Sequence, residues 1–433
     1  MRTGLLLLLF LHQSCGGGEG QSQGPQPPNI VLIVADDLGY ADLGVQGSAD
    51  VLSPRIDSLA NEGVRFTSGY VSSPVCSPTR AGLMTGRYPQ RFGHELNPPR
   101  PPPPGFGLPL GEITIAQALE AAGYATGLVG KWHLGSEAPF HPLSRGFDEF
   151  FGFLGGSRSY RDWSADGGDP VLRGFEPVVE GTYLTDAFSR EAVSFVERHA
   201  DEPFFLYLAF NAVHRPLETP PRRYLDRFTD VTDPKRRKFL AMLAAMDDGV
   251  GAVIDALQAA GIARRTVVIF LSDNGGETSL NTSRNTPFRG GKEDLWEGGI
   301  RVPYIVRWPG RVPAGLAYDS PVSQLDIFAT ALAAAGATLP GDRTIDGVDL
   351  VPYLDGTVSG TPHATLFWRY GSLAAARNGN WKLVKDGANP SQLFDLAADI
   401  GETTDLAAFR PEVVAGVEAD LAAWKAELAP PLW

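Results

Sequence analysis

The sequence predicts an α/β protein with a large, mostly parallel sheet between helices, and a smaller C-terminal α+β subdomain containing an antiparallel sheet. Apolar runs typical of buried strands alternate with helical segments, which predicts the parallel sheet. Three of these runs end in polar residues. The composition changes after about residue 356, which predicts the second subdomain. Because sites in parallel sheets form at the carboxyl ends of strands, we expect the polar strand ends to share one site.

The first predicted strand is Ile30–Val34, an apolar and β-branched run typical of a strand buried on both faces. A helix is predicted over 53–63, with Ser53 as N-cap, Pro54 in the first turn and Gly63 as its end. The later elements of this domain are a helix over 112–123, a strand and loop over 124–135, a strand over 203–214, a helix over 235–261 and a strand over 266–276.

The chain is expected to hold a main domain over 29–355 and a C-terminal subdomain over 356–433. Short antiparallel strands and a closing helix near 411–426 are predicted in the subdomain. A proline-rich stretch, Pro98–Pro104, is typical of a stiff surface loop.

The N-terminus predicts export. Residues 1–15 combine an early Arg2 with the apolar block Leu5–Leu11, which is too short to span a bilayer and suits a signal peptide. Residues 16–28 are a flexible linker rich in Gly, Ser, Gln and Pro. Cys15 stands where a bacterial lipoprotein signal would place its lipidated cysteine. We therefore expect either a periplasmic or outer-membrane lipoprotein anchored at Cys15, or a secreted protein.

The charge and composition of the chain limit the classes of partner that it is expected to bind. The 433 residues have 43% apolar content and a formal net charge of -13. These values describe an ordinary globular protein and argue against nucleic-acid binding, which favours a basic face. An anionic substrate stays compatible, because local positive charge can dominate a pocket.

Hard oxygen ligands follow two of the predicted strands: Asp36 and Asp37 after the first, and Asp273 and Asn274 after the last. Oxygen-rich sets suit Ca²⁺ or Mg²⁺ better than zinc. Either pair alone could be a simple turn, since Asp, Asn and Gly favour turns. Two such pairs, each after a buried strand, favour a metal site.

Cys76 lies in the stretch CSPTR and is one of only two cysteines in the sequence. We expect a helix to begin here, capped by Ser77 with Pro78 in its first turn, and with Arg80 one turn along. Such a helix end favours an anion. Two other readings stay open: a buried structural cysteine, and a thiolate nucleophile with a histidine base.

Further cationic and imidazole groups lie at loop positions. Lys131 and His133 are two residues apart on an extended segment, so we expect them to point the same way. His214 follows a predicted strand, and Lys292 lies in a Gly-flanked loop. Singly each suits a surface position, but together they form a set suited to a small tetrahedral oxyanion.

The sequence resembles the sulfatase family, of the arylsulfatase or N-acetylgalactosamine-6-sulfatase type, within the alkaline phosphatase superfamily. CSPTR fits the family signature Cys-x-Pro-x-Arg. The resemblance continues, in family order, through IVLIVADDLGY, LMTGRYP, GKWHLG, SDNGG, GGKEDLWEGGIRVPYIVRWPG and LFDLAADIGETTDLA. It covers nearly everything from Asn29 onward and implies an alkaline phosphatase-like fold and hydrolysis of sulfate esters.

The resemblance also implies the chemistry of the site. A formylglycine-generating enzyme would convert Cys76 to Cα-formylglycine, whose hydrate attacks sulfur. One Ca²⁺ would be held by Asp36, Asp37, Asp273, Asn274 and position 76. In the remaining roles, Arg80 would steady the hydrate, Lys131 and Lys292 would hold the sulfuryl oxygens, His214 would serve the leaving alcohol, and His133 would take a proton during elimination of sulfate.

A sulfated carbohydrate is the expected substrate, with His94, Glu95, residues 157–163 and Trp296 as candidates for the sugar site. Two alternatives stay open. One is a phosphonate monoester or phosphodiester hydrolase on the same fold. The other is a non-catalytic glycan-binding lipoprotein, which loss of Cys76, Lys131 or a metal carboxylate would have favoured; none is lost.

Overall fold

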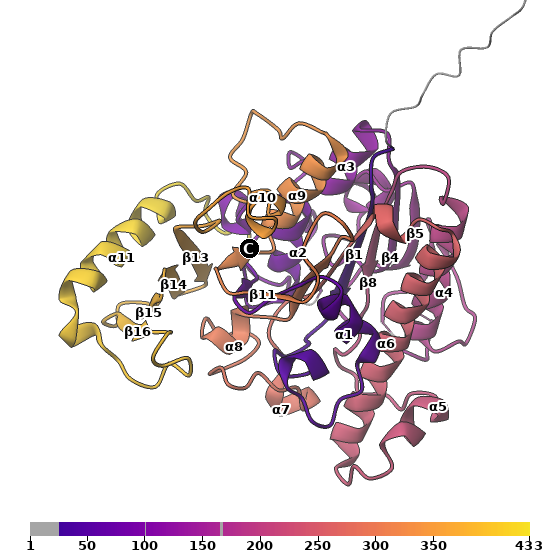
Figure 1. Cartoon of the computed structure of the whole chain (residues 1–433), viewed down its shortest axis with the longest axis horizontal. Coiled ribbons are helices and arrows are strands. Elements are labelled where there is room, and N and C mark those ends of the chain that lie inside the picture. The colour runs from indigo at the N-terminus through magenta and orange to yellow at the C-terminus, as the bar shows by residue number, and fades with distance from the viewer. Residues whose placement is uncertain (1–25, 100, 165–167) are drawn as a thin grey trace, which may run out of the picture.

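The computed structural model describes residues 26–99, 101–164 and 168–433. Within these residues, ten strands form the main sheet in the order β11-β2-β10-β9-β1-β8-β4-β5-β6-β7 (Figure 1). The central strands β9, β1, β8, β4 and β5 run parallel to one another. Strand β10 is antiparallel to β9, and β6 is antiparallel to β5. The predicted mostly parallel sheet is therefore confirmed, with antiparallel pairs toward both edges.

The strands of the main sheet are β1 (Asn29–Ala35), β2 (Val64–Phe66), β4 (Ala125–Lys131), β5 (Glu149–Phe153), β6 (Leu172–Arg173), β7 (Glu176–Pro177), β8 (Phe204–Ala209), β9 (Thr266–Ser272), β10 (Tyr304–Arg307) and β11 (Leu316–Tyr318). Strands β3 (Gly69–Tyr70) and β12 (Val322–Ser323) form a parallel pair of their own. The helices are α1 (Pro54–Asn61), α2 (Cys76–Thr85), α3 (Ile115–Ala121), α4 (Leu184–Arg198), α5 (Arg222–Leu225), α6 (Pro234–Ala259), α7 (Thr278–Asn281), α8 (Glu297–Ile300), α9 (Asp326–Ala335), α10 (Val351–Leu354) and α11 (Pro411–Lys425).

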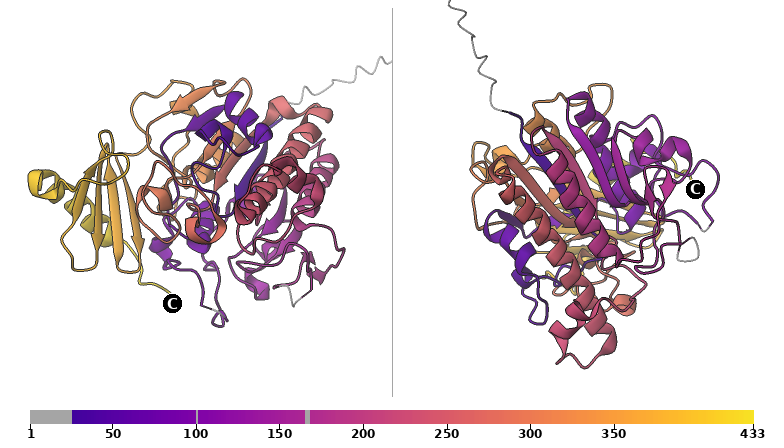
Figure 2. Two further views of the ribbon diagram at one scale, coloured as in Figure 1. Left: turned by 90° about the horizontal axis from the view of Figure 1, so that it is seen from below. Right: turned by 90° about the vertical axis from the view of Figure 1, so that its right-hand side faces the viewer.

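Strand β1 is buried along its whole length because helices cover both faces of the sheet (Figure 2). Its alternate side chains point to opposite faces, as in any strand. Val31, Ile33 and Ala35 join the apolar cluster that includes α1, α4 and α6. The residues between them join a second cluster with α2, α3 and α9. The continuous apolar run that predicted this strand thus serves two cores.

Local capping explains where the predicted helices begin. Helix α3 begins at Ile115 rather than near 112, because Thr114 and Gln117 form a capping box. Helix α6 begins at Pro234, after Asp233 accepts a hydrogen bond from the backbone N–H of Lys235. Ser53 precedes α1 as predicted, but its hydroxyl donates to Asp57 and accepts from the backbone N–H of Gly44 instead of capping the helix.

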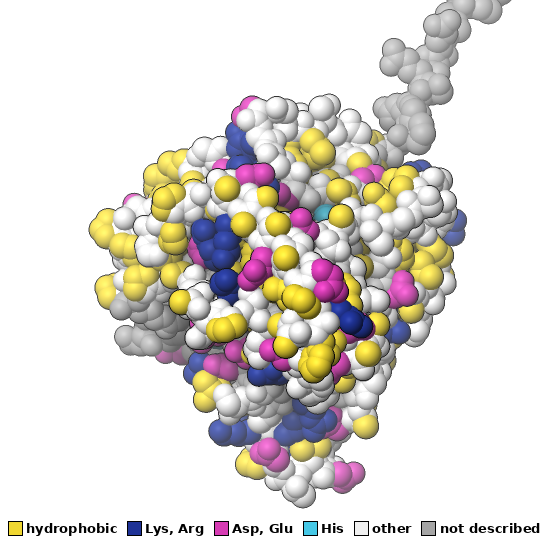
Figure 3. Space-filling view, turned by 90° about the vertical axis from the view of Figure 1, so that its left-hand side faces the viewer, with side chains coloured by type: hydrophobic (Ala, Val, Ile, Leu, Met, Phe, Trp, Pro, Cys, Tyr) yellow, Lys and Arg dark blue, Asp and Glu magenta, His cyan; other side chains and the backbone are white. Residues whose placement is uncertain are grey.

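The C-terminal residues form a separate antiparallel sheet in the order β13-β14-β15-β16, made of Thr365–Tyr370, Leu373–Asn378, Trp381–Asp386 and Gln392–Asp395. Helix α11 packs on one face of this sheet through Val417, Leu421 and Trp424. The other face, including Trp368 and Phe394, packs on residues of the main domain. Figure 3 shows the left-hand side of Figure 1, where α11 and the C-terminal sheet lie. Basic, acidic and hydrophobic side chains are interspersed on this surface. The predicted antiparallel sheet and closing helix are both present.

A buried ion cluster joins the C-terminal sheet to α8 of the main domain. Lys382 of β15 lies 2.9 Å from Glu297 and 2.8 Å from Glu402, and all three side chains are fully buried or nearly so. Glu297 also pairs with Arg301 at 3.0 Å. Burial raises the pKa of Glu297, but Lys382 and Arg301 outweigh it and hold that pKa at about 2. The carboxylate therefore stays charged and fixes the C-terminal sheet to the main domain.

Residues 1–15, with Cys15, and most of the linker at 16–28 lie outside the described residues. Their assignment as signal, lipidation site and linker stays a prediction. Among the described residues, no helix has the length and apolar character needed to cross a membrane.

Candidate active site

The predicted site residues meet at the carboxyl edge of the parallel strands. They are Asp36 and Asp37 after β1, Lys131 at the end of β4, His133 beyond it, His214 after β8, Asp273 and Asn274 after β9, Lys292 in the 289–296 loop, and Cys76 and Arg80 on α2. The register of the strands brings the ends that carry Asp36 and Asp273 together, because Ala35 of β1 lies beside Ser272 of β9. The sequence-based expectation of one shared site is matched by this geometry.

Carboxylates and cations alternate through the centre of the site. Lys131 Nζ lies 2.6 Å from Asp36 Oδ2, and Lys292 Nζ lies 2.8 Å from Asp37 Oδ1. Arg80 donates from Nε and Nη2 to Asp273 Oδ2, at 3.0 and 2.7 Å. Arg80, Lys131 and the three carboxylate side chains are buried. Ion pairs of this kind are tolerated in a low-dielectric interior only when each charge has a partner.

The paired charges of the site balance, with three carboxylates against the cations Arg80, Lys131 and Lys292. Burial by itself would raise the pKa of Asp36, but Lys131, His214, Arg80 and Lys292 together hold it well below its ordinary range. Burial and the adjacent Asp36 raise the pKa of Asp273 despite Arg80. A divalent cation added to this balanced set would leave the site net positive, which favours a sulfate-like anion.

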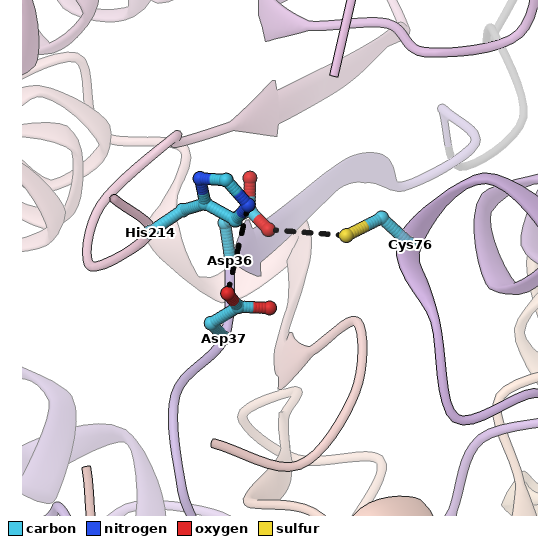
Figure 4. Close-up of side chains that lie close together, drawn as sticks. All are labelled: Asp36, Asp37, Cys76 and His214. Atoms are coloured by element: carbon cyan, nitrogen blue, oxygen red, sulfur yellow. Dashed lines mark hydrogen bonds and ion pairs between the residues drawn. The ribbon is translucent and has the colours of Figure 1, made fainter. Parts of the chain in front are cut away.

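The donor set fits a hard cation. Asn274 donates from Nδ2 to Asp37 Oδ1 at 2.8 Å, while its own Oδ1 is buried with no hydrogen-bond partner. An orphaned amide oxygen beside carboxylate oxygens is a ligand type that Ca²⁺ uses. Asp36, Asp37, Cys76 and His214 also offer ligand atoms within 4.8 Å of one another (Figure 4). This compact group includes His214, and it leaves out Asp273, whose carboxylate binds Arg80.

Cys76 is the first residue of α2 and is 1% exposed. Its thiol donates to Asp36 Oδ1 at 3.5 Å. Burial first, and then Asp273, raise the pKa of the thiol far above its ordinary value, even though Lys131 and Lys292 oppose the shift. An unmodified Cys76 is therefore a neutral thiol that is hydrogen-bonded to a carboxylate. This disfavours the alternative in which Cys76 is a thiolate nucleophile with a histidine base.

Ser77 was predicted to cap α2 but lies inside the helix, because α2 begins at Cys76 with Val75 at the N-cap position, two residues before Ser77. Its hydroxyl donates to the backbone carbonyl of His133 at 2.7 Å and lies 2.7 Å from His94 Nε2. His133 needs this support because its φ is 60°, in the left-handed region. Ser77 thus links the start of α2 to the strained residue that carries the site imidazole.

His133 and Lys131 do not lie on one extended segment, because β4 ends at Lys131 and His133 turns left-handed. The His133 ring fits beside Gly156, where a Cβ atom would stand 2.5 Å from Nε2. Burial first, and then Lys131 and Arg80, lower the pKa of His133 well below its ordinary value. Its Nδ1 is buried without a hydrogen-bond partner. The ring is therefore neutral, and one of its nitrogens is left without a partner.

A cavity of about 540 Å³ opens from Cys76 to the surface. His133, His214 and Lys292 line it near Cys76, whereas Lys131 and Arg80 lie behind the carboxylates and do not line it. Its volume is within the range of about 300–1,000 Å³ that small-molecule sites occupy. The site can therefore admit a substrate larger than a bare inorganic anion.

Most residues proposed for the sugar site have structural roles instead. His94 is fully buried behind Ser77, and burial lowers its pKa to about 3. Glu95 is buried in an ion pair with Arg369 at 2.6 Å. Trp296 packs against Phe394 of the C-terminal sheet. Within the segment 157–163, only Ser157 lines the cavity.

Some residues around the site escaped the sequence reasoning. The partnership of Ser77 with His94 joins residues 17 positions apart, through contacts that no spacing rule predicts. The proline-rich stretch has the composition of a stiff surface loop, yet Pro98, Pro99, Pro101 and Pro102 line the cavity. In the sequence, the one indication of this role is that the proline-rich stretch follows the LMTGRYP block, which belongs to the resemblance to the sulfatase family.

Comparison with known proteins shows which family the chain belongs to. The family model described as Sulfatase matches residues 28–337. The N-acetylgalactosamine-6-sulfatase of Canis lupus familiaris is 38% identical over 406 residues, covering 88% of this chain and 75% of the dog protein. The chain belongs to the sulfatase family, and it is a sulfuric ester hydrolase.

Solved structures extend the likeness over the whole described fold. The crystal structure of Ps i-CgsB in complex with k-i-k-neocarrahexaose is 37% identical, with a TM-score of 0.90, and covers 94% of this chain and 95% of that one. The phosphonate monoester hydrolase of Agrobacterium radiobacter, at 22% identity and a TM-score of 0.69, shares the fold and covers 92% of this chain and 96% of that one. The alkaline phosphatase-like fold expected from the sequence is confirmed.

Proposed function

We propose that this enzyme hydrolyses sulfate esters of carbohydrates, with a formylglycine made from Cys76 as nucleophile and one bound Ca²⁺. The observation that carries the proposal is the position of Cys76. It is the innermost nucleophilic position of the cavity, in contact with Asp36, with Lys292, His214 and His133 beside it. The CSPTR signature begins at this residue.

Asp36, Asp37, Asp273, Asn274 and position 76 are proposed to hold the Ca²⁺. The orphaned Asn274 Oδ1 and the oxygen-rich surroundings support this set, and His214 is near enough to Asp37, at 3.6 Å, to contribute. Bound Ca²⁺ supplies positive charge that attracts the sulfate group and favours loss of a proton from a nearby hydroxyl. Arg80 keeps Asp273 in place through two hydrogen bonds.

The side chains that line the cavity are proposed to act on the ester itself. Lys292 carries a pKa that its carboxylate and thiol neighbours raise despite burial, so it stays cationic and can hold a sulfuryl oxygen. His214 is the candidate for the leaving alcohol, because its ring is partly exposed at the cavity. His133, held neutral, is the candidate acceptor for the proton lost when sulfate is eliminated. Lys131, which pairs with Asp36, is proposed to stabilise the negative charge of the sulfuryl oxygens from behind that carboxylate.

A carbohydrate substrate is supported by two similarities. A relative at 38% identity is named for N-acetylgalactosamine-6-sulfate, and a structure at 37% identity is in complex with a neocarrahexaose. The cavity also combines apolar proline and phenylalanine side chains with polar groups. Sugar rings need both, since their C–H faces are apolar and their edges are hydroxylated.

The test is to produce the chain with a formylglycine-generating enzyme and to analyse the peptide containing residue 76 by mass spectrometry. Release of inorganic sulfate is then measured on a panel of sulfated sugars and an aryl sulfate, with Cys76→Ala as the control. We expect the aldehyde at position 76, sulfate release, and no release by the control. A thiol that persists, or hydrolysis restricted to phosphonate monoesters and phosphodiesters, would contradict the proposal.

A further inference from the structure

The cavity has a depth gradient that orders the substrate within it. Cys76 is buried at its inner end, whereas Pro99, Pro101 and Pro102 line the same cavity and are exposed. A sulfate group placed against residue 76 therefore directs the rest of its molecule outward past the prolines. The unit that follows the sulfated one is then within reach of this loop.

The prolines form a preorganised apolar surface. The ring of each proline fixes φ and removes the backbone N–H, so the loop offers C–H groups with little freedom to lose on binding. The loop ends at Phe106, which is buried and packs on Trp433 at 4.7 Å between ring centroids. Gly105 donates its backbone N–H to Glu137 at 2.8 Å. These contacts fix the C-terminal end of the loop to the body of the domain.

Polar groups also line the outer cavity, beside the apolar side chains of Leu154 and Pro170. Residues 155–157, which follow β5, contribute two glycines and the hydroxyl of Ser157. Ser136 adds a second hydroxyl, and Asp169 adds a carboxylate. A pyranose ring matches such a pair of surfaces, because its C–H face is apolar and its hydroxyl groups lie at its edge.

We propose that Pro98, Pro99, Pro101 and Pro102 form a subsite for the sugar unit next to the sulfated one, so that the enzyme prefers a sulfated oligosaccharide to a sulfated monosaccharide. This inference rests on the proposed function and adds a specificity element to it. The apolar face of the neighbouring pyranose covers the prolines, while the sulfated unit reaches residue 76.

The test uses the double variant Pro101→Ser/Pro102→Ser and the control variant Pro104→Ser. Pro104 is exposed in the same loop but does not line the cavity. The substrates are sulfated oligosaccharides, k-i-k-neocarrahexaose among them, each compared with the monosaccharide that carries the same sulfated sugar, and 4-methylumbelliferyl sulfate as an aryl ester without a neighbouring sugar. For each protein the formylglycine content at residue 76 is measured, and kcat/KM is expressed per modified enzyme.

For the wild type we expect kcat/KM to be at least tenfold higher on the best oligosaccharide than on the monosaccharide. The double variant is expected to lose about tenfold on the oligosaccharide, equal to about 1.4 kcal/mol, mostly through KM, and less than twofold on the aryl sulfate. The Pro104→Ser control should match the wild type on both.

Two results would overturn the subsite. One is a wild type that hydrolyses the monosaccharide as well as any oligosaccharide. The other is a double variant that loses the same factor on the aryl sulfate as on the oligosaccharide. Failure of the proposed function looks different, because the modified wild type would then release sulfate from none of these compounds, the aryl sulfate included.

Discussion

The Lys382→Met variant is expected to lose about 3–5 kcal/mol of unfolding free energy at pH 7.5, the cost found when one partner of a buried ion pair is removed. Lys382 is fully buried and lies between Glu297 and Glu402, at 2.9 and 2.8 Å. Methionine keeps the apolar stem but removes the charge. Glu297 would then keep its ion pair with Arg301, while Glu402 would lose the one salt bridge it makes among the described residues.

The loss should depend on pH. In the wild type, the depressed pKa of Glu297 contributes stability that is present above its unfolded value and lost as pH falls through about 2. In the variant, Glu402 loses its cation, and burial already raises its pKa. Its protonation relieves the repulsion, so the difference between variant and wild type should shrink as pH falls from 7.5 to 5.

The assay is urea unfolding followed by tryptophan fluorescence at several pH values. Lys385→Met is the matched control, since Lys385 lies on the same strand in a partly exposed pair with Glu418 at 3.4 Å and should cost less than about 1 kcal/mol. Lys382→Met/Glu402→Gln should recover part of the loss. A Lys382→Met loss below about 1 kcal/mol, or one independent of pH, would refute the reasoning.

Three further predictions concern the site. Ser77→Ala should lower kcat about tenfold per modified enzyme with KM little changed, because the carbonyl of His133 loses its donor, while Ser77→Thr should keep most activity; equal loss in both variants would contradict this. Burial lowers the pKa of His94 to about 3, so its stability contribution is complete above its unfolded pKa of about 6.5 and is lost as pH falls toward 3. The stability advantage of wild type over His94→Gln should therefore shrink by about 2 kcal/mol between pH 7 and 5, and a constant difference in urea unfolding would argue against burial as the cause. Asn274→Ala should weaken Ca²⁺ binding at least tenfold by calorimetry, because it removes the orphaned Oδ1, and unchanged affinity would exclude Asn274 as a ligand.

Much of the fold could be predicted because its signals are local. The run Ile30–Val34 has the composition of a strand buried on both faces, and Asp36 and Asp37 mark where it ends. Parallel register then brings the ends of β1 and β9 together without further information. The positions of the carboxylates follow from these two facts.

The remaining features depend on contacts between distant segments. Glu402 belongs to a block near the end of the sequence that resembles the sulfatase family, and in the structure it binds Lys382 and the backbone N–H of Glu297. His94 looked like a substrate contact, but packing places it behind Ser77. Side-chain burial of this kind depends on the completed core, which sequence periodicity does not describe.

The complete burial of α2 limits the stage of folding at which another enzyme can reach its residues. Every residue from Cys76 to Thr85 is buried, and Arg80 is fixed to Asp273 inside the sheet edge. An enzyme that reads Cys-x-Pro-x-Arg as a peptide needs access to these side chains, which the folded domain denies. If Cys76 is modified as proposed, the modification would therefore have to precede closure of the main sheet. Under that proposal, folding and oxidation compete for the same chain, and a molecule that folds first would keep its thiol for as long as it stays folded.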